Sequence, residues 1–155
     1  MKKKVSIIAS FRNEEKNINE FIDRINNSFK KRKHIDYELI FIDDFSNDLS
    51  NTLIKKACTK NKRIKLITLK KNYGSDPSIQ TGFDFVNKKN YAAVIDCDLQ
   101  EQPELIARNL SKIEKDQTIH FVRKKREDNF FKRFYSKIAY LILHFISKGK
   151  IIMNT

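Results

Sequence analysis

In residues Val5–Phe29, VSIIASFRNEEKNINEFIDRINNSF, a short apolar run precedes an amphipathic segment. The run Val5–Ala9 is rich in branched side chains, which is typical of a strand buried in a parallel sheet. Across Glu14–Lys31 the apolar side chains recur at helical spacing and form one stripe: Ile18, Phe21, Ile22, Ile25 and Phe29. A buried strand followed by a helix of this kind predicts a β-α unit.

The same alternation continues along the chain. Further apolar runs predict strands at Glu38–Ile42, Ile64–Leu69, Tyr91–Ile95 and Ile119–Val122, and the segments between them predict helices at Asp48–Thr59, Pro77–Val86 and Pro103–Lys115. This order predicts an α/β fold with a mainly parallel sheet flanked by helices. Ligands bind beyond the carboxyl ends of the strands in such sheets, so the residues that follow each strand are the first candidates for a site.

Length and composition set the class of protein. The chain has 155 residues, of which 40% are hydrophobic and 11% aromatic, enough for one domain with a real core. No apolar run approaches the ~18 residues of a membrane-spanning helix. The two cysteines, Cys58 and Cys97, form no CxxC motif and favour a reduced, cytoplasmic protein over a disulfide scaffold.

The formal net charge is +13, which favours an anionic partner: a polyanion, an anionic membrane surface or a phosphorylated substrate. A solvated basic surface is the competing interpretation, and we prefer it for Lys30–Lys33 and Lys55–Lys71. Nucleic-acid binding is disfavoured, since the sequence contains no recognition module for RNA or DNA.

Acidic residues follow two of the predicted strands. Asp43 and Asp44 end the second strand, and Asp48 lies a few residues later. Helix capping explains part of this cluster, because aspartate is a favoured residue type at helix N-termini. Capping does not account for a carboxylate pair directly at the strand end, so we favour a role in ligand binding.

The sharper acidic motif is Asp96-Cys97-Asp98, which follows the strand Tyr91–Ile95. In extended chain the two carboxylates share one face while Cys97 points away. Hard oxygen ligands suit Mg²⁺ or Mn²⁺, which commonly take phosphate oxygens as further ligands. Gln100 adds a carbonyl oxygen from the following turn, so we expect Asp96, Asp98 and Gln100 to form a metal site, with Cys97 as a small buried thiol.

Together these motifs resemble the family-2 glycosyltransferases with the GT-A fold, and in particular the polyprenyl-phosphate hexosyltransferases such as dolichol-phosphate mannose synthase. The resemblance extends over Val5–Glu15, Glu38–Asp48, Lys71–Gly82, Val94–Glu104 and Val122–Tyr140, in the order that the family has. It implies a nucleotide-sugar-binding GT-A core at residues 1–122. Residues 123–155 are then a basic, aromatic segment and amphipathic helix of the same domain that faces the acceptor or membrane.

The resemblance also implies roles for individual residues. Ser10, Arg12 and Glu14 contact the nucleotide, and Asp43 and Asp44 bind the base and ribose. Asp96, Asp98 and Gln100 correspond to the metal and diphosphate site, with Asp98 catalytic. The acceptor phosphate is held by four residues: Arg123, Lys132, Arg133 and Ser136. The implied reaction transfers a hexose from a UDP- or GDP-linked sugar to a polyprenyl phosphate with inversion at the anomeric carbon. The acceptor phosphate is already an anionic nucleophile, so no strong general base is required.

The segment Arg123–Lys137 carries seven Lys or Arg and two acidic residues, interleaved with aromatic side chains. Phe134, Ile138, Leu141, Ile142 and Phe145 continue it as an apolar stripe at helical spacing. One interpretation is an interfacial helix on an anionic leaflet, which would place the protein at the inner face of the cell membrane. The other is a helix packed against the rest of the protein, and the sequence favours neither.

The chain departs from the family pattern at several positions. Ser10 and Arg12 replace the common proline and tyrosine, and Phe45 occupies a glycine position where it could strain the turn or crowd the base pocket. The chain ends at Thr155, before the family's Gly-Asp-Phe-Arg-Leu segment. We therefore expect a domain that is incomplete at the C-terminus: either part of a transferase, including one that acts on a polysaccharide or other glycan, or a non-catalytic module that binds a nucleotide sugar or membrane surface.

Overall fold

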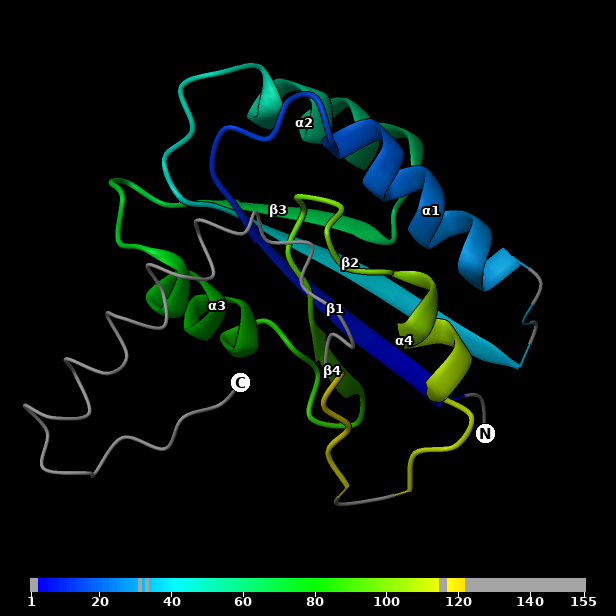
Figure 1. Cartoon of the computed structure of the whole chain (residues 1–155). Helices are drawn as coiled ribbons and strands as arrows, with labels where there is room; N and C mark the ends of the chain where they lie inside the picture. Colours follow the sequence, from blue (N-terminus) through cyan, green and yellow to red (C-terminus); the bar gives the residue numbers. More distant parts are fainter. Residues whose placement is uncertain (1–2, 31, 33, 115–116, 122–155) are drawn as a thin grey trace, which may run out of the picture. The chain divides into compact units, whose positions relative to one another are not determined.

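The computed structural model describes residues 3–30, 32, 34–114 and 117–121 (Figure 1). Four strands and four helices alternate within these residues: β1 (Lys3–Phe11), α1 (Ile18–Lys30), β2 (Ile35–Asp43), α2 (Ser50–Lys60), β3 (Ile64–Thr68), α3 (Ser75–Asp84), β4 (Tyr91–Val94) and α4 (Glu104–Asn109). The chain divides into two compact units, Met1–Gln117 and Thr118–Thr155. All eight elements belong to the first unit.

The four described strands form one parallel sheet in the order β3-β2-β1-β4. Ser6 pairs with Glu38 and Phe11 with Asp43 between β1 and β2, and Ile8 pairs with Val94 between β1 and β4. The chain runs outward from β1 through β2 to β3 and then returns to place β4 on the opposite side of β1. This reversal creates a topological switch point between the carboxyl ends of β1 and β4, where ligands of open α/β sheets bind.

Helices cover both faces of the sheet. On one face α1, α2 and α4 bury the main core, whose members include Ile7, Phe21, Phe41, Ile54 and Ile106. On the other face α3 packs over a smaller cluster formed by Ile8, Ile40 and Ile42. Figure 1 shows α1 and α2 together on one side of the sheet and α3 on the other. These three layers confirm the α/β fold with a parallel sheet that the sequence predicts.

Close packing of α3 on β1 depends on a glycine. A Cβ atom at Gly82 would lie 2.4 Å from Cγ2 of Ile8, far inside contact distance. Hydrogen at this position lets the helix backbone approach the strand and brings the helix N-terminus, Gly74–Ser75, to the carboxyl edge of the sheet.

The structure confirms four of the predicted strands and the four predicted helices, but their first and last residues differ from those predicted. The helix predicted from Glu14 begins at Ile18, and the one predicted to reach Lys115 ends at Asn109. The predicted strand Ile119–Val122 is wrong in its described part, because residues 119–121 have no regular structure and Ile119 and Phe121 are exposed. An apolar run forms a strand only beside a partner, and none of the described strands pairs with this one.

The basic, aromatic segment predicted at residues 123–155, with its amphipathic helix, lies outside the described residues. Within the described part of the chain, no helix combines the length and apolar character needed to cross a bilayer.

Candidate active site at the carboxyl edge of the sheet

A cavity of about 260 Å³ opens at the switch point between β1 and β4. Six residues predicted from the sequence line it: Ser10, Arg12, Glu14, Asp44, Asp96 and Asp98. The structure thus brings together residues from the carboxyl end of β1 and from the connections that follow β1, β2 and β4, which are far apart in the sequence. Phe11, Ser75 and Cys97 complete the lining, and Asp43 and Gln100 are not part of it.

The loop after β1 is held by the loop after β2. The backbone amide of Asn13 donates to Ser46 Oγ at 3.0 Å, and that of Glu14 donates to Ser50 Oγ at 2.8 Å. In the opposite direction, the Asn47 amide donates to Asn13 Oδ1 at 2.9 Å. These reciprocal bonds fix the backbone on both sides of Arg12 and Glu14, which line the cavity.

Asp48 belongs to this framework and does not line the cavity. Its two carboxylate oxygens accept the backbone amides of Glu15 at 3.0 Å and Ser50 at 2.9 Å. Burial favours the neutral carboxyl, but the hydrogen bonds from Ser50 and Glu15 outweigh it and lower the pKa of Asp48. Asp48 therefore acts just before α2 by accepting the amide of its first residue, although the N-cap position itself is Leu49.

The neighbouring carboxylates Asp43 and Asp44 have different surroundings. Asp43 is 1% exposed, and it accepts the Ser46 amide at 2.8 Å and the Asn51 side-chain amide at 2.7 Å. Both of its oxygens thus stabilise the turn between β2 and α2. Since alternate strand residues face opposite ways, the next carboxylate, Asp44, is directed toward the cavity.

Asp44 links the cavity to the approach of α3. Its Oδ1 accepts the Tyr73 amide at 2.7 Å and its Oδ2 accepts the Gly74 amide at 2.8 Å. Gly74 has φ 90° and ψ 172°, a conformation open essentially to glycine alone. The turn places Ser75, the first residue of α3, in the cavity lining. Sequence reasoning missed Ser75, although the Gly74-Ser75 turn before a predicted helix was a usable signal.

The acidic turn after β4 forms the negative side of the cavity. Asp98 Oδ1 accepts the Gln100 amide at 3.0 Å, which closes the turn over Leu99. Cys97 is 1% exposed, as expected for a small buried thiol. Burial raises its pKa well above the ordinary value, and the carboxylates of Glu14, Asp96 and Asp98 raise it further. Three carboxylates therefore act on one buried group, and their negative charge is concentrated at this end of the cavity.

The donor set suits a hard divalent cation that also binds a ligand. Among the described residues, no three or more His, Cys, Asp or Glu side chains are arranged to hold a metal ion by themselves. Mg²⁺ and Mn²⁺ are commonly bound through one or two carboxylates, with phosphate oxygens and water completing the shell. Asp96 and Asp98 fit that pattern. Gln100 contributes its backbone amide to Asp98, and its side chain does not line the cavity.

Contacts of α4 and of the residues after it hold the segment that follows the acidic turn. Arg24 of α1 forms a bidentate ion pair with Glu104 at the start of α4, with both N–O distances 2.8 Å. At the other end of α4, Lys3 Nζ donates to the Ile113 carbonyl at 2.7 Å. The segment that follows the acidic turn is therefore anchored to α1 and β1. The four residues predicted to bind an acceptor phosphate lie outside the described residues: Arg123, Lys132, Arg133 and Ser136.

Comparison with known families gives this geometry its context. Residues 6–154 match the family described as Glycosyl transferase family 2. The chain belongs to this family. It is 33% identical over 140 residues to the "Uncharacterized glycosyltransferase YkcC" of Bacillus subtilis (strain 168), covering 89% of this chain and 43% of that protein.

A second relative within the family is the undecaprenyl-phosphate 4-deoxy-4-formamido-L-arabinose transferase of Pseudomonas fluorescens (strain Pf0-1). It is 33% identical over 139 residues, covering 88% of this chain and 40% of that enzyme. The chain thus spans about two fifths of the length of both relatives.

Solved structures share the fold. S. aureus TarS 1-349 superimposes with a TM-score of 0.57 at 19% identity, over 70% of this chain and 31% of that one. The mannosyltransferase PcManGT of Pyrobaculum calidifontis, in complex with GDP-Man and Mn²⁺, gives 0.57 at 18% identity, over 69% and 31%. A TarS complex with UDP-GlcNAc gives 0.51 at 22% identity, over 61% and 26%. These likenesses confirm the GT-A fold that the family resemblance implies.

Proposed function

We propose that this chain forms the nucleotide-sugar-binding part of a family-2 transferase that moves a hexose from a UDP- or GDP-linked sugar to a polyprenyl phosphate. The observation that carries the proposal is the convergence of six residues, from the carboxyl ends of β1, β2 and β4 and the connections after them, on the cavity between β1 and β4. Family membership supports the reaction class. The relative named for undecaprenyl phosphate supports the acceptor class.

In this proposal the nucleotide lies across the loops that follow β1 and β2. Asp44 is buried at the cavity wall and has its two oxygens fixed by backbone amides, so its position is set before a ligand arrives. It accepts hydrogen bonds from the base or ribose. Ser10 and Glu14 provide further polar contacts, and Arg12 provides a cationic one. Asp43 acts indirectly, by holding the turn that carries Ser46.

Asp96 and Asp98 are the residues that would hold Mg²⁺ or Mn²⁺ beside the donor diphosphate. When bound, the ion supplies Lewis-acid stabilisation of the negative charge that develops on the departing diphosphate. Asp98, which the Gln100 amide orients, is the carboxylate nearest to the reaction in this assignment. Cys97 stays a neutral thiol, because burial and the adjacent carboxylates raise its pKa.

The acceptor half of the site belongs to the basic segment outside the described residues. Arg123, Lys132, Arg133 and Ser136 are proposed to hold the polyprenyl phosphate in line with the anomeric carbon. An in-line attack by that phosphate inverts the anomeric centre. The basic and aromatic composition of Arg123–Lys137 suits the anionic inner face of the cell membrane, where such a lipid resides.

A transfer assay tests the proposal. The full chain is incubated with radiolabelled UDP- and GDP-sugars, Mn²⁺ and vesicles that contain polyprenyl phosphate, and label in the lipid fraction is measured. We expect transfer by the wild type and by Asp84→Asn, whose carboxylate is exposed at the end of α3 and outside the cavity. We expect Asp98→Asn to reduce the rate by about 100-fold or more. Metal-dependent donor binding without any transfer would instead identify a non-catalytic binding module.

A further inference from the structure

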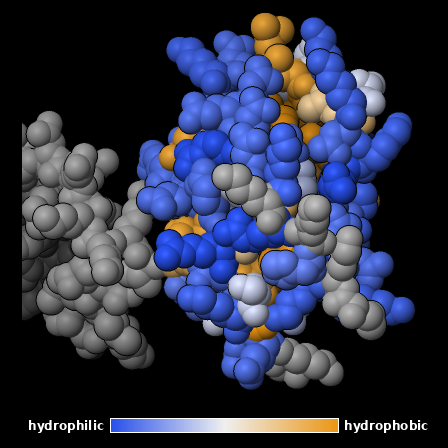
Figure 2. All heavy atoms as spheres, turned by 90° about the vertical axis from the view of Figure 1, so that its right-hand side faces the viewer, coloured by the Kyte–Doolittle hydropathy of each residue, from blue (hydrophilic) through white to orange (hydrophobic). Residues whose placement is uncertain are grey.

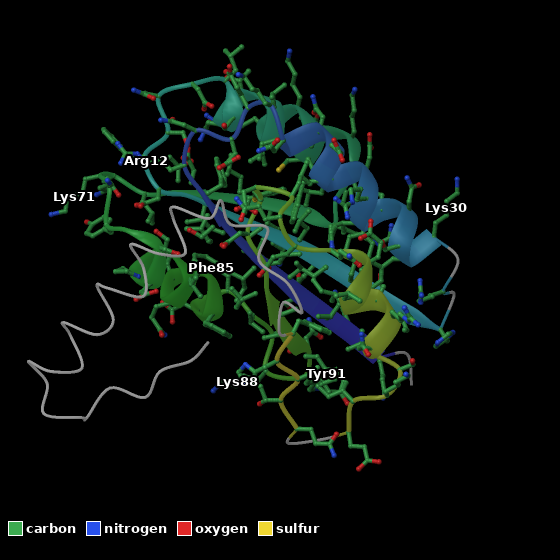
Figure 3. All side chains as sticks on the ribbon, in the orientation of Figure 1. Arg12, Lys30, Lys71, Phe85, Lys88 and Tyr91 are labelled. Carbon is green, nitrogen blue, oxygen red and sulfur yellow. The ribbon has the colours of Figure 1, made fainter. Side chains whose placement is uncertain are left out.

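Charged residues are distributed unevenly between the amino-terminal ends of the parallel strands (the amino edge) and their carboxyl-terminal ends (the carboxyl edge). The described connections that lead into strands β2, β3 and β4 (residues 32, 34, 61–63 and 85–90) contain five Lys or Arg and no Asp or Glu. The connections that leave the four strands (12–17, 44–49, 69–74 and 95–103) contain seven Asp or Glu and four Lys or Arg. The amino edge of the sheet is therefore strongly basic, and the carboxyl edge carries the acidic cavity. In Figure 3, Lys30 and Lys88 lie away from the edge that carries Arg12 and Lys71.

The amino edge also has a hollow of about 610 Å³, which we call the amino-edge hollow. Its volume falls within the range of about 300–1,000 Å³ typical of small-molecule sites. Phe29, Lys30 and Arg32 line it from the end of α1, Asp36 and Tyr37 from the start of β2, and Arg63 from the residue before β3. Figure 2 faces this side of the molecule, where hydrophilic side chains predominate.

Two of the three cations of the hollow, Arg63 and Arg32, are positioned by their neighbours. Arg63 Nε donates to Asp36 Oδ1 at 3.2 Å, and its guanidinium lies 5.6 Å from the centroid of the Tyr37 ring. One guanidinium nitrogen of Arg32 donates to the Ser28 carbonyl at 2.6 Å. Each contact uses one nitrogen of a guanidinium group. The other N–H groups of that planar guanidinium remain available to a ligand.

The wall between these cations is rigid. The rings of Phe29 and Tyr37 are in contact, with centroids 4.5 Å apart, and both residues are 5% exposed. The Tyr37 hydroxyl donates to Asn26 Oδ1, which also accepts from Asn61 Nδ2 at 3.3 Å. Side chains from α1, β2 and the end of α2 are thus linked around the hollow, and the cations project from a fixed base.

We propose that the amino-edge hollow is a second anion site, which binds a phosphate group through Lys30, Arg32 and Arg63. The only described acidic side chain in its lining, Asp36, is paired with Arg63, so the remaining charge is positive. Planar guanidinium groups match the geometry of phosphate oxygens, and charge-assisted hydrogen bonds to them are strong. The phosphate can belong to a small soluble ester or to a phospholipid headgroup. This site is independent of the proposed transferase function, because it lies at the opposite edge of the sheet.

The test is an amide NMR titration of the full chain with inorganic pyrophosphate, at constant ionic strength and with EDTA present. Without a divalent metal the acidic cavity at the carboxyl edge repels the probe. We expect saturable shifts of the amides of Asn27, Lys30 and Tyr37. The variant Lys30→Gln/Arg32→Gln/Arg63→Gln should weaken binding by about tenfold or more. The matched control Lys55→Gln/Lys56→Gln/Lys112→Gln removes the same charge from exposed positions outside the hollow and should weaken it less than about twofold.

Equal weakening in the two triple variants, or shifts spread over all lysine-rich segments, would overturn the site and leave only general attraction to a basic protein. A second arm compares glycerol 3-phosphate with sedimentation on phosphatidylglycerol vesicles. Preference for the soluble ester identifies a small-molecule ligand, and triple-variant-sensitive binding to vesicles alone identifies a headgroup. Asp98→Asn should leave all of these results unchanged, so failure of the transferase proposal and failure of this site are distinguishable.

Discussion

Among the residues that the structure describes, three other than glycine have left-handed backbone conformations: Asn13 at φ 58°, Phe45 at φ 65° and Leu99 at φ 61°. Each lies directly beside a cavity-lining residue, since Asn13 follows Arg12, Phe45 follows Asp44 and Leu99 follows Asp98. Strained backbone persists where the surrounding structure fixes it, and it concentrates at functional sites. The hydrogen bonds of Asn13 and Asp98 described above supply that constraint, so strain and site coincide in three separate loops.

Phe45 offers a direct measure of this strain. A left-handed conformation costs a residue other than glycine about 1–2 kcal/mol, while glycine loses about 0.5–1 kcal/mol more backbone entropy on folding. Phe45 is 53% exposed, so removing its side chain loses less packing than the removal of a core phenylalanine would. We therefore expect Phe45→Gly to leave the free energy of unfolding unchanged or to raise it by up to about 1 kcal/mol.

Urea unfolding of Phe45→Gly beside Phe85→Gly checks this expectation. Phe85 is the matched control: it is 49% exposed but has an ordinary φ of −97°, so glycine there should lower the free energy of unfolding by about 0.5–1 kcal/mol through backbone entropy, in addition to the lost packing. Equal losses in the two variants would show that the turn at Phe45 is unstrained.

The residue types that line the site could be predicted from the sequence, but the separate roles of Asp43 and Asp44 could not. Asp43 and Asp44 are chemically identical neighbours at a strand end. Which of them faces the cavity depends on the register of β2 and on donors as distant as Tyr73 and Gly74. Asp43 instead bonds to Asn51, a partner that only the folded β2–α2 connection brings close.

For the secondary-structure elements, the periodicity of apolar residues predicts which segments form helices and strands. It predicts the residues at which these elements begin and end much less well. The amphipathic stripe of α1 contains Ile18, Phe21 and Ile25, all fully buried as predicted. The helix nevertheless begins at Ile18, after a turn in which the amides of Asn17 and Ile18 both donate to the Glu14 carbonyl. The amides of Glu14 and Glu15 donate to Ser50 and Asp48 beyond β2, and a single sequence does not reveal such tertiary contacts at a helix start.

The contact between α3 and β1 gives a prediction at this scale. Gly82→Ala would place a methyl group 2.4 Å from Cγ2 of Ile8, and the fully buried Ile8 has little freedom to move. We expect the free energy of unfolding to fall by about 1–3 kcal/mol, because overpacking forces the helix outward. Thermal and urea unfolding measure the change.

Gln80→Ala is the control, since Gln80 is exposed on the same helix and its substitution by a better helix former should be neutral or slightly stabilising. A Gly82→Ala protein as stable as the control would mean that α3 does not pack on β1 as closely as described.

At the scale of the whole molecule, a buried polar network joins three strands to the approach of β4. Glu38 Oε1 accepts from Ser6 Oγ at 2.6 Å and from Asn90 Nδ2 at 3.0 Å, and its Oε2 lies 2.8 Å from Lys65 Nζ. These residues belong to β1, β2 and β3 and to the turn that precedes β4. Such a network holds the crossover that creates the switch point.

The network predicts how stability depends on pH. Burial raises the pKa of Glu38, but the hydrogen bonds from Lys65 and Ser6 outweigh it and lower that pKa overall. The stability contributed by a carboxylate with a lowered pKa is fully present above its ordinary value of about 4.3 and is lost as the pH falls through the folded-state pKa. We expect Glu38→Gln to lower the free energy of unfolding by about 1–3 kcal/mol at pH 7, and by less at pH 3.

Urea unfolding at both pH values measures this difference. The control Glu20→Gln removes an exposed carboxylate from α1 and should change little at either pH. A Glu38→Gln deficit that stays the same at pH 3 would show that the charge of Glu38 contributes nothing to the network.

The parallel sheet could be predicted from the sequence because four apolar runs alternate with amphipathic segments. The position of the cavity followed from that topology and from acidic residues at two strand ends. The polar network could not be predicted, since only the register of β1 and β2 pairs Ser6 with Glu38. The amino-edge hollow was likewise hidden, because Lys30–Lys33 read as solvated surface.

Calorimetric titration measures whether the cavity between β1 and β4 binds a nucleotide sugar through a metal held by Asp96 and Asp98. The full chain is titrated with UDP- and GDP-sugars with and without Mn²⁺, beside Asp98→Asn and the control Asp84→Asn. We predict saturable, Mn²⁺-dependent binding of one nucleotide class, weakened about 10–100-fold in Asp98→Asn and unchanged in Asp84→Asn. Binding of equal strength in wild type and Asp98→Asn, or no binding of either nucleotide class, would contradict the account.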